Sequence, residues 1–269
     1  ALLKTSKNII LQGPPGVGKT FVAQRIAYAL MREKAKERVR MVQFHQSYSY
    51  EDFVQGFRPT NDGKFRRKDG VFYRFSEKAR KDEERPYVFI IDEINRGNLS
   101  KIFGELMMLV EADKRGPDWG MPLQYGTPED PPFHVPENVH LIGMMNTADR
   151  SLAVVDYALR RRFRFVDISP ALQSRRFAAY LAGRHVPTQV IELIQTRIGR
   201  LNRTIAQDIR QLGPGFCIGH SFFCPALDEP DLSEAWYRRV IEYEIGPLLK
   251  EYYFDDPERA EQEIINLLG

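Results

Sequence analysis

The segment Gly13-Pro14-Pro15-Gly16-Val17-Gly18-Lys19-Thr20 has the residue types and the spacing of a phosphate-binding loop. It fits the pattern G-x-x-x-x-G-K-T and stands between an apolar run, NIILQ at residues 8–12, and an amphipathic stretch that begins at Phe21. In such a loop, backbone N–H groups and the N-terminus of the following helix surround a β-phosphate. Lys19 is expected to reach the β- and γ-phosphate oxygens, and the Thr20 hydroxyl to bind Mg²⁺. The expected nucleotide-contacting residues are Gly13, Pro14, Pro15, Gly16, Val17, Gly18, Lys19, Thr20 and Phe21.

An acidic pair follows a second apolar run, YVFII at residues 87–91. This run predicts a buried parallel strand whose carboxyl end delivers Asp92 and Glu93 to the edge where α/β sheets bind ligands. Asp92 is expected to hold Mg²⁺ through water, and Glu93 to act as the general base that polarises the attacking water. The pair therefore favours hydrolysis over binding alone.

A third apolar run, residues 139–145, ends in Asn146-Thr147-Ala148-Asp149. The strands that carry the phosphate loop and Asp92 are expected side by side in a parallel sheet, so Asn146 would lie near the γ-phosphate and orient water. The rival interpretation reads N-x-x-D as a guanine-binding element, but Thr147 stands where small GTPases normally carry Lys. The sensor interpretation is therefore preferred, and the motif does not establish guanine specificity.

Three adjacent arginines, Arg160, Arg161 and Arg162, end a predicted helix in which Leu152, Val155, Ala158 and Leu159 recur at helical spacing. A final strand, FRFVDI, follows at residues 163–168. One or two of the arginines are expected to act as arginine fingers on the γ-phosphate of a neighbouring subunit. The alternative is a solvated basic helix end that complements the helix dipole.

The pattern of the chain changes near residue 169, from alternating strands and helices to helical segments. With 269 residues, of which 43% are hydrophobic, the chain predicts an α/β nucleotide-binding domain at 1–168 and a smaller all-α lid at 169–269. Aromatic residues of the lid are expected to form its core rather than a base-stacking platform; they are Trp236, Tyr237, Tyr243, Tyr252, Tyr253 and Phe254. In the stretch GFCIGHS, His220 or Ser221 is a candidate nucleotide contact, although a structural histidine is an equal alternative.

Two segments exceed what a minimal nucleotide-binding fold needs. The first, between residues 45 and 87, is basic and carries Asp69-Gly70 as a hairpin signal, with Arg66, Arg67 and Lys68 expected at the tip. This tip would contact DNA or a partner protein, or would be a solvated hairpin. In the second, which is rich in proline, residues 121–125 and 133–135 are expected to pair as a hairpin.

The overall composition is that of a soluble globular protein. The net charge of +3 does not by itself indicate nucleic-acid or membrane binding. Cys217 and Cys224 do not have zinc-ligand spacing and are interpreted as buried or half-buried thiols. No membrane span and no signal peptide is recognised, so a cytoplasmic location is expected. Because the chain enters a strand almost at once, an upstream domain is also expected.

Taken together, the motifs closely resemble the McrB family, the AAA+ subunits of McrBC modification-dependent restriction systems. The resemblance covers residues from about Asn8 to the C-terminus and includes linking segments as well as phosphate motifs: GPPGVGKT, MVQFHQSYSYEDFVQGFRP, FIIDEINRGNLSKIFGELMMLVE, LIGMMNTADRSLAVVDYALRRRF, GFCIGHSFF and EYYFDDP. It implies an AAA+ P-loop NTPase fold with hairpin insertions and a helical lid.

The resemblance further implies a hexameric ring that hydrolyses GTP rather than ATP with Mg²⁺, recruits an McrC-type nuclease subunit and translocates on DNA. A separate N-terminal domain would read 5-methylcytosine, so this chain alone is expected to bind DNA weakly and not to cut it. Carried over by position, Asn146 and Asp149 form the family's NTAD element, and Arg161 or Arg162 makes the contact in trans.

Two other functions compete with this interpretation. One is an ATP-dependent protein-remodelling ATPase of the MoxR type, against which the linking segments argue. The other is an assembly scaffold that binds nucleotide without turnover, against which Glu93 argues.

Overall fold

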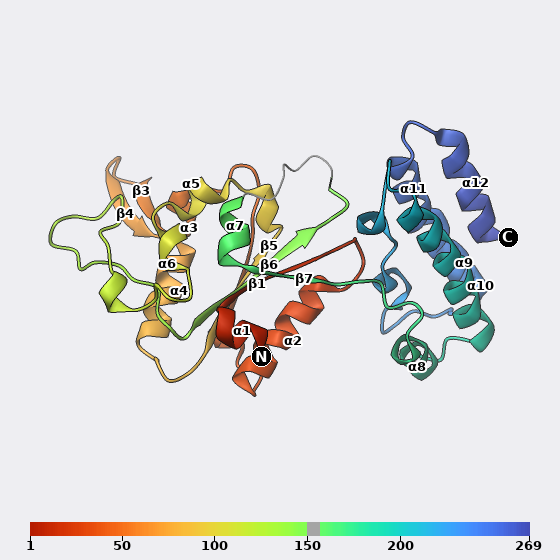
Figure 1. The fold of residues 1–269 in the computed structure, drawn as a ribbon, viewed down its shortest axis with the longest axis horizontal. Coiled ribbons are helices and arrows are strands. Elements are labelled where there is room, and N and C mark those ends of the chain that lie inside the picture. Colours follow the sequence, from red (N-terminus) through yellow and green to blue (C-terminus); the bar gives the residue numbers. More distant parts are fainter. Residues whose placement is uncertain (150–156) are drawn as a thin grey trace. The chain divides into compact units, whose positions relative to one another are not determined.

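The structure is a computed structural model that describes residues 1–149 and 157–269 (Figure 1). The chain divides into two compact units. The first comprises residues 1–12, 20–145 and the described part of 150–166, and the second comprises residues 13–19, 146–149 and 167–269. The phosphate loop and the segment Asn146–Asp149 thus belong to the same unit as the helical C-terminal part. The domain boundary proposed after Ile168 stays a prediction.

The first unit is built on a parallel sheet in which, within the described residues, five strands take the order β2-β5-β6-β1-β7. The expectation that β1 and β5 are neighbours is wrong, because β6 lies between them. β5 pairs in parallel with β2 on one side and with β6 on the other. The strands are β1 (Asn8–Gly13), β2 (Val39–Gln43), β5 (Tyr87–Asp92), β6 (Val139–Asn146) and β7 (Arg164–Asp167).

Helices connect these strands and lie along the sheet in the first unit (Figure 1). They are α1 (Leu2–Ser6), α2 (Lys19–Met31), α3 (Tyr50–Phe53), α4 (Val71–Arg80), α5 (Leu99–Phe103), α6 (Leu106–Leu109) and α7 (Tyr157–Arg162), with short 3₁₀ turns η1 (Lys36–Arg38), η2 (Ile94–Arg96) and η3 (Pro117–Trp119). α7 runs into the three arginines as expected. The first part of that predicted helix, which includes Leu152 and Val155, lies outside the described residues.

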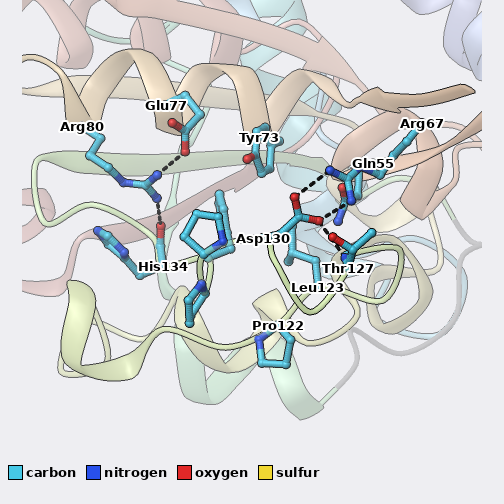
Figure 2. Close-up of a pocket in the computed structure, with 14 residues that line it drawn as sticks. Gln55, Arg67, Tyr73, Glu77, Arg80, Pro122, Leu123, Thr127, Asp130 and His134 are labelled. Carbon is cyan, nitrogen blue, oxygen red and sulfur yellow. Dashed lines mark hydrogen bonds and ion pairs between the residues drawn. The ribbon is translucent and has the colours of Figure 1, made fainter.

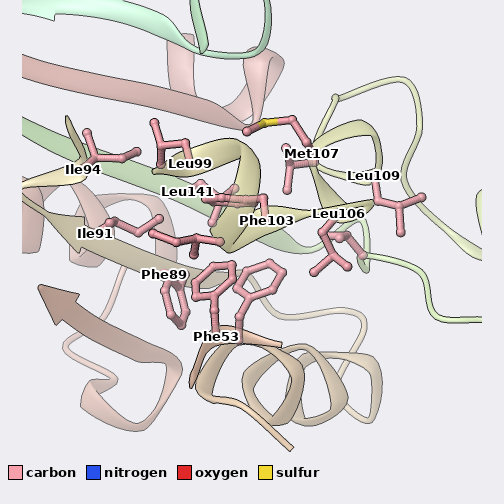
Figure 3. Close-up of a cluster of buried hydrophobic side chains, with 14 of the residues drawn as sticks. Phe53, Phe89, Ile91, Ile94, Leu99, Phe103, Leu106, Met107, Leu109 and Leu141 are labelled. Atoms are coloured by element: carbon pink, nitrogen blue, oxygen red, sulfur yellow. The ribbon is translucent and has the colours of Figure 1, made fainter. Parts of the chain in front are cut away.

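The core of the first unit packs aromatic rings and aliphatic side chains against one face of the sheet (Figure 3). Phe53 of α3 is fully buried, and its ring stacks on that of Phe72 at a centroid distance of 4.9 Å. The ring of Phe89, from the central part of β5, meets both rings edge-on. The continuous apolar runs of β5 and β6 fold as buried strands because both faces of the sheet are covered.

The first insertion forms a hairpin, but its turn is not where the sequence predicts it. β3 (Gln55–Pro59) and β4 (Phe65–Asp69) pair antiparallel, and Asp62-Gly63 lies in the turn between them. Gly70 instead precedes α4 as its N-cap. Arg66, Arg67 and Lys68 are therefore strand residues of β4 and not the hairpin tip. The physical reason is burial, since starting α4 at Val71 places Phe72 in the core.

The second insertion contains less regular structure than expected. Met121 and Phe133 form an isolated antiparallel bridge, with N–H···O distances of 3.0 and 2.8 Å, instead of two paired strands. Arg67 of β4 forms an ion pair with Asp130 of this insertion, at the rim of a cavity of about 330 Å³ (Figure 2). The pairing with Arg67 and the N–H bond from Thr127 hold the pKa of Asp130 well below its usual range. The two insertions are thus tied to each other.

The second unit has a helical core of its own. Its helices are α8 (Arg175–Gly183), α9 (Thr188–Gln207), α10 (Glu234–Val240), α11 (Gly246–Tyr252) and α12 (Pro257–Leu268), with a π-helical stretch η6 (Ile241–Ile245) and 3₁₀ turns η4 (Pro214–Phe216) and η5 (His220–Phe223). No helix in the described ranges is both long and apolar enough to cross a membrane. α12 was not expected from the sequence, although Asp256 caps it by accepting a bond from the Arg259 N–H at 3.1 Å, and Pro257 occupies its first position.

The aromatic residues of the lid divide into two groups. Trp236, Tyr237, Tyr252 and Tyr253 are buried, as expected for core residues. Tyr243 and Phe254 are 75% and 71% exposed, so their assignment to the core is wrong. The thiols also differ. Cys217 is buried as expected, but Cys224 is exposed, so its assignment as a buried or half-buried thiol is wrong.

Candidate functional site

The phosphate loop leaves β1 at Gly13 and enters α2 at Lys19. Gly16 and Gly18 have φ angles of 72° and 74°, a left-handed conformation that L side chains adopt only with strain. A Cβ at Gly18 would meet no atom within 4 Å, so backbone conformation and not space requires glycine there. The two glycines therefore allow a tight turn directly before the N-terminus of α2, and a loop of this kind ahead of a helix is the arrangement that binds phosphate.

The Lys19 ammonium is held against the backbone of the same loop. Its Nζ donates to the carbonyl oxygens of Gly13 at 2.8 Å and Pro14 at 2.9 Å. These bonds fix the positive charge of Lys19, the first residue of α2, at the loop. The geometry suits a cation that neutralises phosphate oxygens.

The stretch Gly215–Phe222 of the lid is bonded to the phosphate loop through backbone atoms. The Gly219 N–H donates to the carbonyl of Pro15 at 3.1 Å, and the Ser221 N–H donates to the carbonyl of Gly16 at 2.7 Å. The fit is close, since a Cβ on Gly219 would lie 2.0 Å from the carbonyl carbon of Gly16. Motif reasoning missed this contact, because backbone donors carry no side-chain signature.

The segment Asn146–Asp149 is bonded to both the loop and the lid. The Thr147 N–H donates to the Gly13 carbonyl at 3.2 Å, and its hydroxyl donates to the Gly215 carbonyl at 2.9 Å. The Asn146 side-chain oxygen accepts the N–H of Ala148 at 3.2 Å, which shapes the turn after β6. The sequence assigned no contact to Thr147, which stands where small GTPases normally carry Lys. In the structure it joins the phosphate loop, the end of β6 and the lid stretch within the second unit.

His220 lies between the two residues whose amides bond to the loop, but its ring has another partner. Its Nδ1 accepts the N–H of Ala171 at 3.1 Å, and the ring meets Phe177 edge-on at 5.7 Å. Burial lowers the pKa of His220, which favours the neutral form that can accept this bond. The ring thus has a structural role, and its predicted contact with the nucleotide stays a prediction.

The acidic pair stands at the end of β5 in the first unit. Glu93 has a φ of 49°, in the left-handed region, and its N–H donates to the Asp92 Oδ1 at 3.0 Å. Its carboxylate pairs with the Nε of Arg96 at 3.1 Å. A non-glycine residue in this conformation stores strain that commonly marks a functional position. The turn thus places two adjacent carboxylates at one strand end.

The residues predicted to hold Mg²⁺ have the oxygen donors that this ion prefers. Asp92 is half-buried, and its Oδ2 accepts no hydrogen bond from the described residues. Thr20, in the first turn of α2, is exposed, and its hydroxyl has no partner in the described parts of the chain. One oxygen of the Asp92 carboxylate and the Thr20 hydroxyl thus remain available, and such oxygen donors fit a hydrated magnesium ion.

Phe21, the next residue of α2, has an exposed aromatic side chain. Its ring is 58% exposed, and the guanidinium carbon of Arg25 lies 3.5 Å from the ring centroid. This is a cation–π contact on the helix surface. Its predicted contact with nucleotide stays a prediction.

The arginines at the end of α7 differ in their surroundings. Arg162 is 16% exposed, its Nε donates to the Met107 carbonyl at 2.6 Å, and it pairs with the Glu111 carboxylate at 3.0 Å. Arg161 is 69% exposed and lies 3.6 Å from the same carboxylate. The Arg160 guanidinium stands 5.5 Å from the ring centroid of Phe165. Arg162 is therefore anchored within the first unit, whereas Arg161 is exposed.

A buried polar network fixes the end of this helix. Asn8, at the start of β1, donates to the carbonyls of Val110 at 2.7 Å and Arg162 at 3.0 Å. Arg115 donates to the Asn8 side-chain oxygen at 2.8 Å and to the Val139 carbonyl at 2.7 Å, and burial lowers its pKa to about 9. The network ties the arginine-bearing helix end to two strands of the sheet.

Comparisons with known proteins agree with this geometry. A family model described as AAA domain (dynein-related subfamily) matches residues 8–163, and one described as McrB, alpha-helical lid domain, matches residues 193–261. The EcoKMcrB subunit of the type IV methyl-directed restriction enzyme of Escherichia coli (strain K12) is 55% identical over 270 residues, or 99% of this chain and 58% of that protein. The component YdiS of the type II restriction enzyme BsuMI of Bacillus subtilis (strain 168) is 25% identical over 194 residues, or 59% of this chain and 56% of that protein.

The loop, the acidic pair and the helical lid define a nucleotide-hydrolysing domain of the AAA class. The chain belongs to the dynein-related subfamily of AAA domains, and its lid is of the McrB type, which confirms the resemblance seen in the sequence. It spans less than three fifths of the length of the two relatives. The MoxR-type alternative is not favoured.

The bonds from the lid to the loop predict a specific effect of Gly219→Ala. The new methyl group would overlap the Gly16 carbonyl and separate the two segments, so two hydrogen bonds would be lost. We expect a loss of about 1 to 3 kcal/mol in the free energy of unfolding, measured by denaturant titration, together with weaker binding of a labelled nucleotide.

The matched control is Gly183→Ala, at the end of α8, where a Cβ meets no atom within 4 Å. It should leave nucleotide binding unchanged and should not lower the free energy of unfolding, because alanine is favoured over glycine in a helix. Equal behaviour of the two variants would show that the contact between the lid and the loop contributes nothing.

Proposed function

We propose that this chain is the GTP-hydrolysing motor part of a modification-dependent DNA restriction complex. Like the McrB subunit that it resembles, it would form a hexameric ring with Mg²⁺, drive DNA translocation and activate a separate McrC-type nuclease subunit. The 55% identity to the EcoKMcrB subunit over 99% of this chain supports the assignment to such a complex. Reading of methylated cytosine would belong to a part of the protein outside this sequence.

The observation that carries hydrolysis is the Asp92-Glu93 turn at the end of β5. The amides of Gly13–Lys19 would bind the β-phosphate, and Lys19 would neutralise the γ-phosphate oxygens. Thr20 and Asp92 would hold Mg²⁺, which would supply charge neutralisation on the phosphate oxygens. Glu93 would accept the proton of the attacking water, which Asn146 would orient. The Arg96 pairing gives the Glu93 carboxylate a defined orientation.

Arg161 is the better candidate for the trans-acting arginine. An arginine finger must reach a neighbouring γ-phosphate, so its guanidinium needs to be accessible. The exposed fraction of its side chain is 69%, against 16% for Arg162. Glu111 pairs with Arg161 and with Arg162. It would orient the Arg161 guanidinium, and the bonds of Arg162 would fix the end of the helix.

The first test is titration of the purified chain with non-hydrolysable GTP and ATP analogues in Mg²⁺, repeated with Asn146→Ala and Asp149→Ala. We expect tighter binding of the GTP analogue, with a preference that survives in both variants because these residues serve the γ-phosphate and not the base. Lys19→Ala should abolish binding of both analogues and serves as the control.

Preference for the ATP analogue would contradict the use of GTP and would favour the alternative function of an ATP-dependent remodelling ATPase. Loss of the preference in Asp149→Ala would instead assign that residue to the base. Full hydrolytic turnover by Glu93→Gln would refute its role as the base.

A second prediction separates the two arginines. Arg161→Ala should lower turnover in the assembled protein by a factor of about 10³ or more without changing the free energy of unfolding. Arg162→Ala should instead destabilise the fold by about 2 kcal/mol, because Glu111 would lose a partially buried partner.

Mixed assemblies test whether Arg161 acts in trans. A Glu93→Gln subunit retains Arg161, and an Arg161→Ala subunit retains Glu93, so mixing two inactive variants should restore part of the turnover. Absence of any recovery, in assemblies shown to contain both variants, would mean that Arg161 does not act across subunits.

A further inference from the structure

A basic depression lies between η1, edge strand β2 and helix α4 in the first unit. It has a volume of about 400 Å³, and Lys36, Arg40, Arg74 and Lys78 line it. Phe75, which is buried, contributes part of its apolar wall. We call this surface the β2–α4 depression. It is formed by residues that the nucleotide site does not use.

Among the described residues that line the β2–α4 depression, four cations face one carboxylate. Glu37 is the single carboxylate among its described lining residues, and that carboxylate is 3.9 Å from Arg38, which lies outside the lining. Lys78 donates to the Glu37 carbonyl at 2.7 Å, and Arg74 donates to the Asp69 carbonyl, so both bond to neutral acceptors. The side chains of Lys36 and Arg40 have no hydrogen bond and no ion pair with the described parts of the chain. Four cations around one concave surface repel one another unless an anion joins them.

The arrangement of the cations suits a row of anionic groups. Arg74 and Lys78 are four residues apart on α4, so they lie on one face of the helix at an axial spacing of about 6 Å. Arg40 stands on the edge strand. Burial and the Asp52 carboxylate raise the pKa of the nearby Tyr48 hydroxyl, whereas Arg40 and Arg74 both act to lower it, so the two guanidinium groups face one region. Asp52 itself is paired with Arg58. Protection of a sheet edge explains one exposed arginine. It does not explain three further cations from η1 and α4.

We propose that the β2–α4 depression binds phosphate groups of a nucleic-acid backbone, independently of base sequence. Lysine and arginine that are not tied to carboxylates are the usual partners of backbone phosphates. The choice of nucleic acid among anionic polymers rests on the proposed function in a DNA restriction complex. The nucleotide site does not depend on it, because these residues lie outside the phosphate loop and the acidic pair.

The test uses fluorescence anisotropy with a labelled, unmethylated DNA duplex of about 30 base pairs over a range of salt concentrations. The double variant Arg40→Ala/Arg74→Ala should bind about tenfold more weakly, and the slope of log K against log salt should fall by about 1.8, that is, about 0.9 for each lost phosphate contact. Arg40→Lys/Arg74→Lys should bind nearly as wild type, since phosphate accepts either cation.

The matched control is Arg175→Ala/Arg176→Ala, which removes two exposed arginines from the start of α8. It should reduce DNA binding less than twofold. An equal loss in both double variants, or no loss in either, would overturn the proposal. Displacement of the DNA by polyglutamate at lower charge concentration than by unlabelled duplex would also overturn it, in favour of an acidic protein partner.

Titration of Arg40→Ala/Arg74→Ala with the GTP analogue separates this proposal from the proposed function. Wild-type nucleotide affinity together with weakened DNA binding supports the β2–α4 depression as a separate site. Weakened affinity for both ligands would instead indicate a general structural defect and would count against the proposal.

Discussion

Two backbone hydrogen bonds, from Gly219 and Ser221 to the carbonyls of Pro15 and Gly16, determine how the second unit is organised. They use main-chain atoms on both sides, so the lid follows the conformation of the phosphate loop directly. Any change in the backbone of the loop at Pro15 or Gly16 therefore acts directly on these bonds. In this way occupancy of the loop can be transmitted to the lid without any side chain that reads the nucleotide.

Thr147 extends the same constraint to the end of β6. Its N–H bonds to the Gly13 carbonyl and its hydroxyl to the Gly215 carbonyl, so one residue joins the start of the loop, the segment Asn146–Asp149 and the lid. In the first unit the corresponding constraint is the buried network of Asn8 and Arg115, which fixes the end of α7. In both units these constraints use backbone carbonyls as acceptors. The donors are main-chain N–H groups and the Thr147 hydroxyl in the second unit, and the side chains of Asn8 and Arg115 in the first.

Much of this architecture follows from the sequence, because continuous apolar runs and the glycine pattern of the loop depend on local chemistry. The runs at residues 8–12, 87–91 and 139–145 are strands of one sheet. The hairpin turn was misplaced because Asp62-Gly63 and Asp69-Gly70 offer the same dipeptide, and only burial of Phe72 decides between them. The order of β5, β6 and β1 and the bond between Thr147 and Gly215 join residues far apart in the chain, so neither has a local signal.

Hydrogen exchange of the Gly219 and Ser221 amides, followed residue by residue by NMR, tests the central claim most directly. If these N–H groups are bonded to the phosphate loop, both should exchange far more slowly than amides of an unstructured chain, and addition of a GTP analogue should change both rates together. Exchange of both amides at the rate of an unstructured chain, with and without nucleotide, would contradict the account.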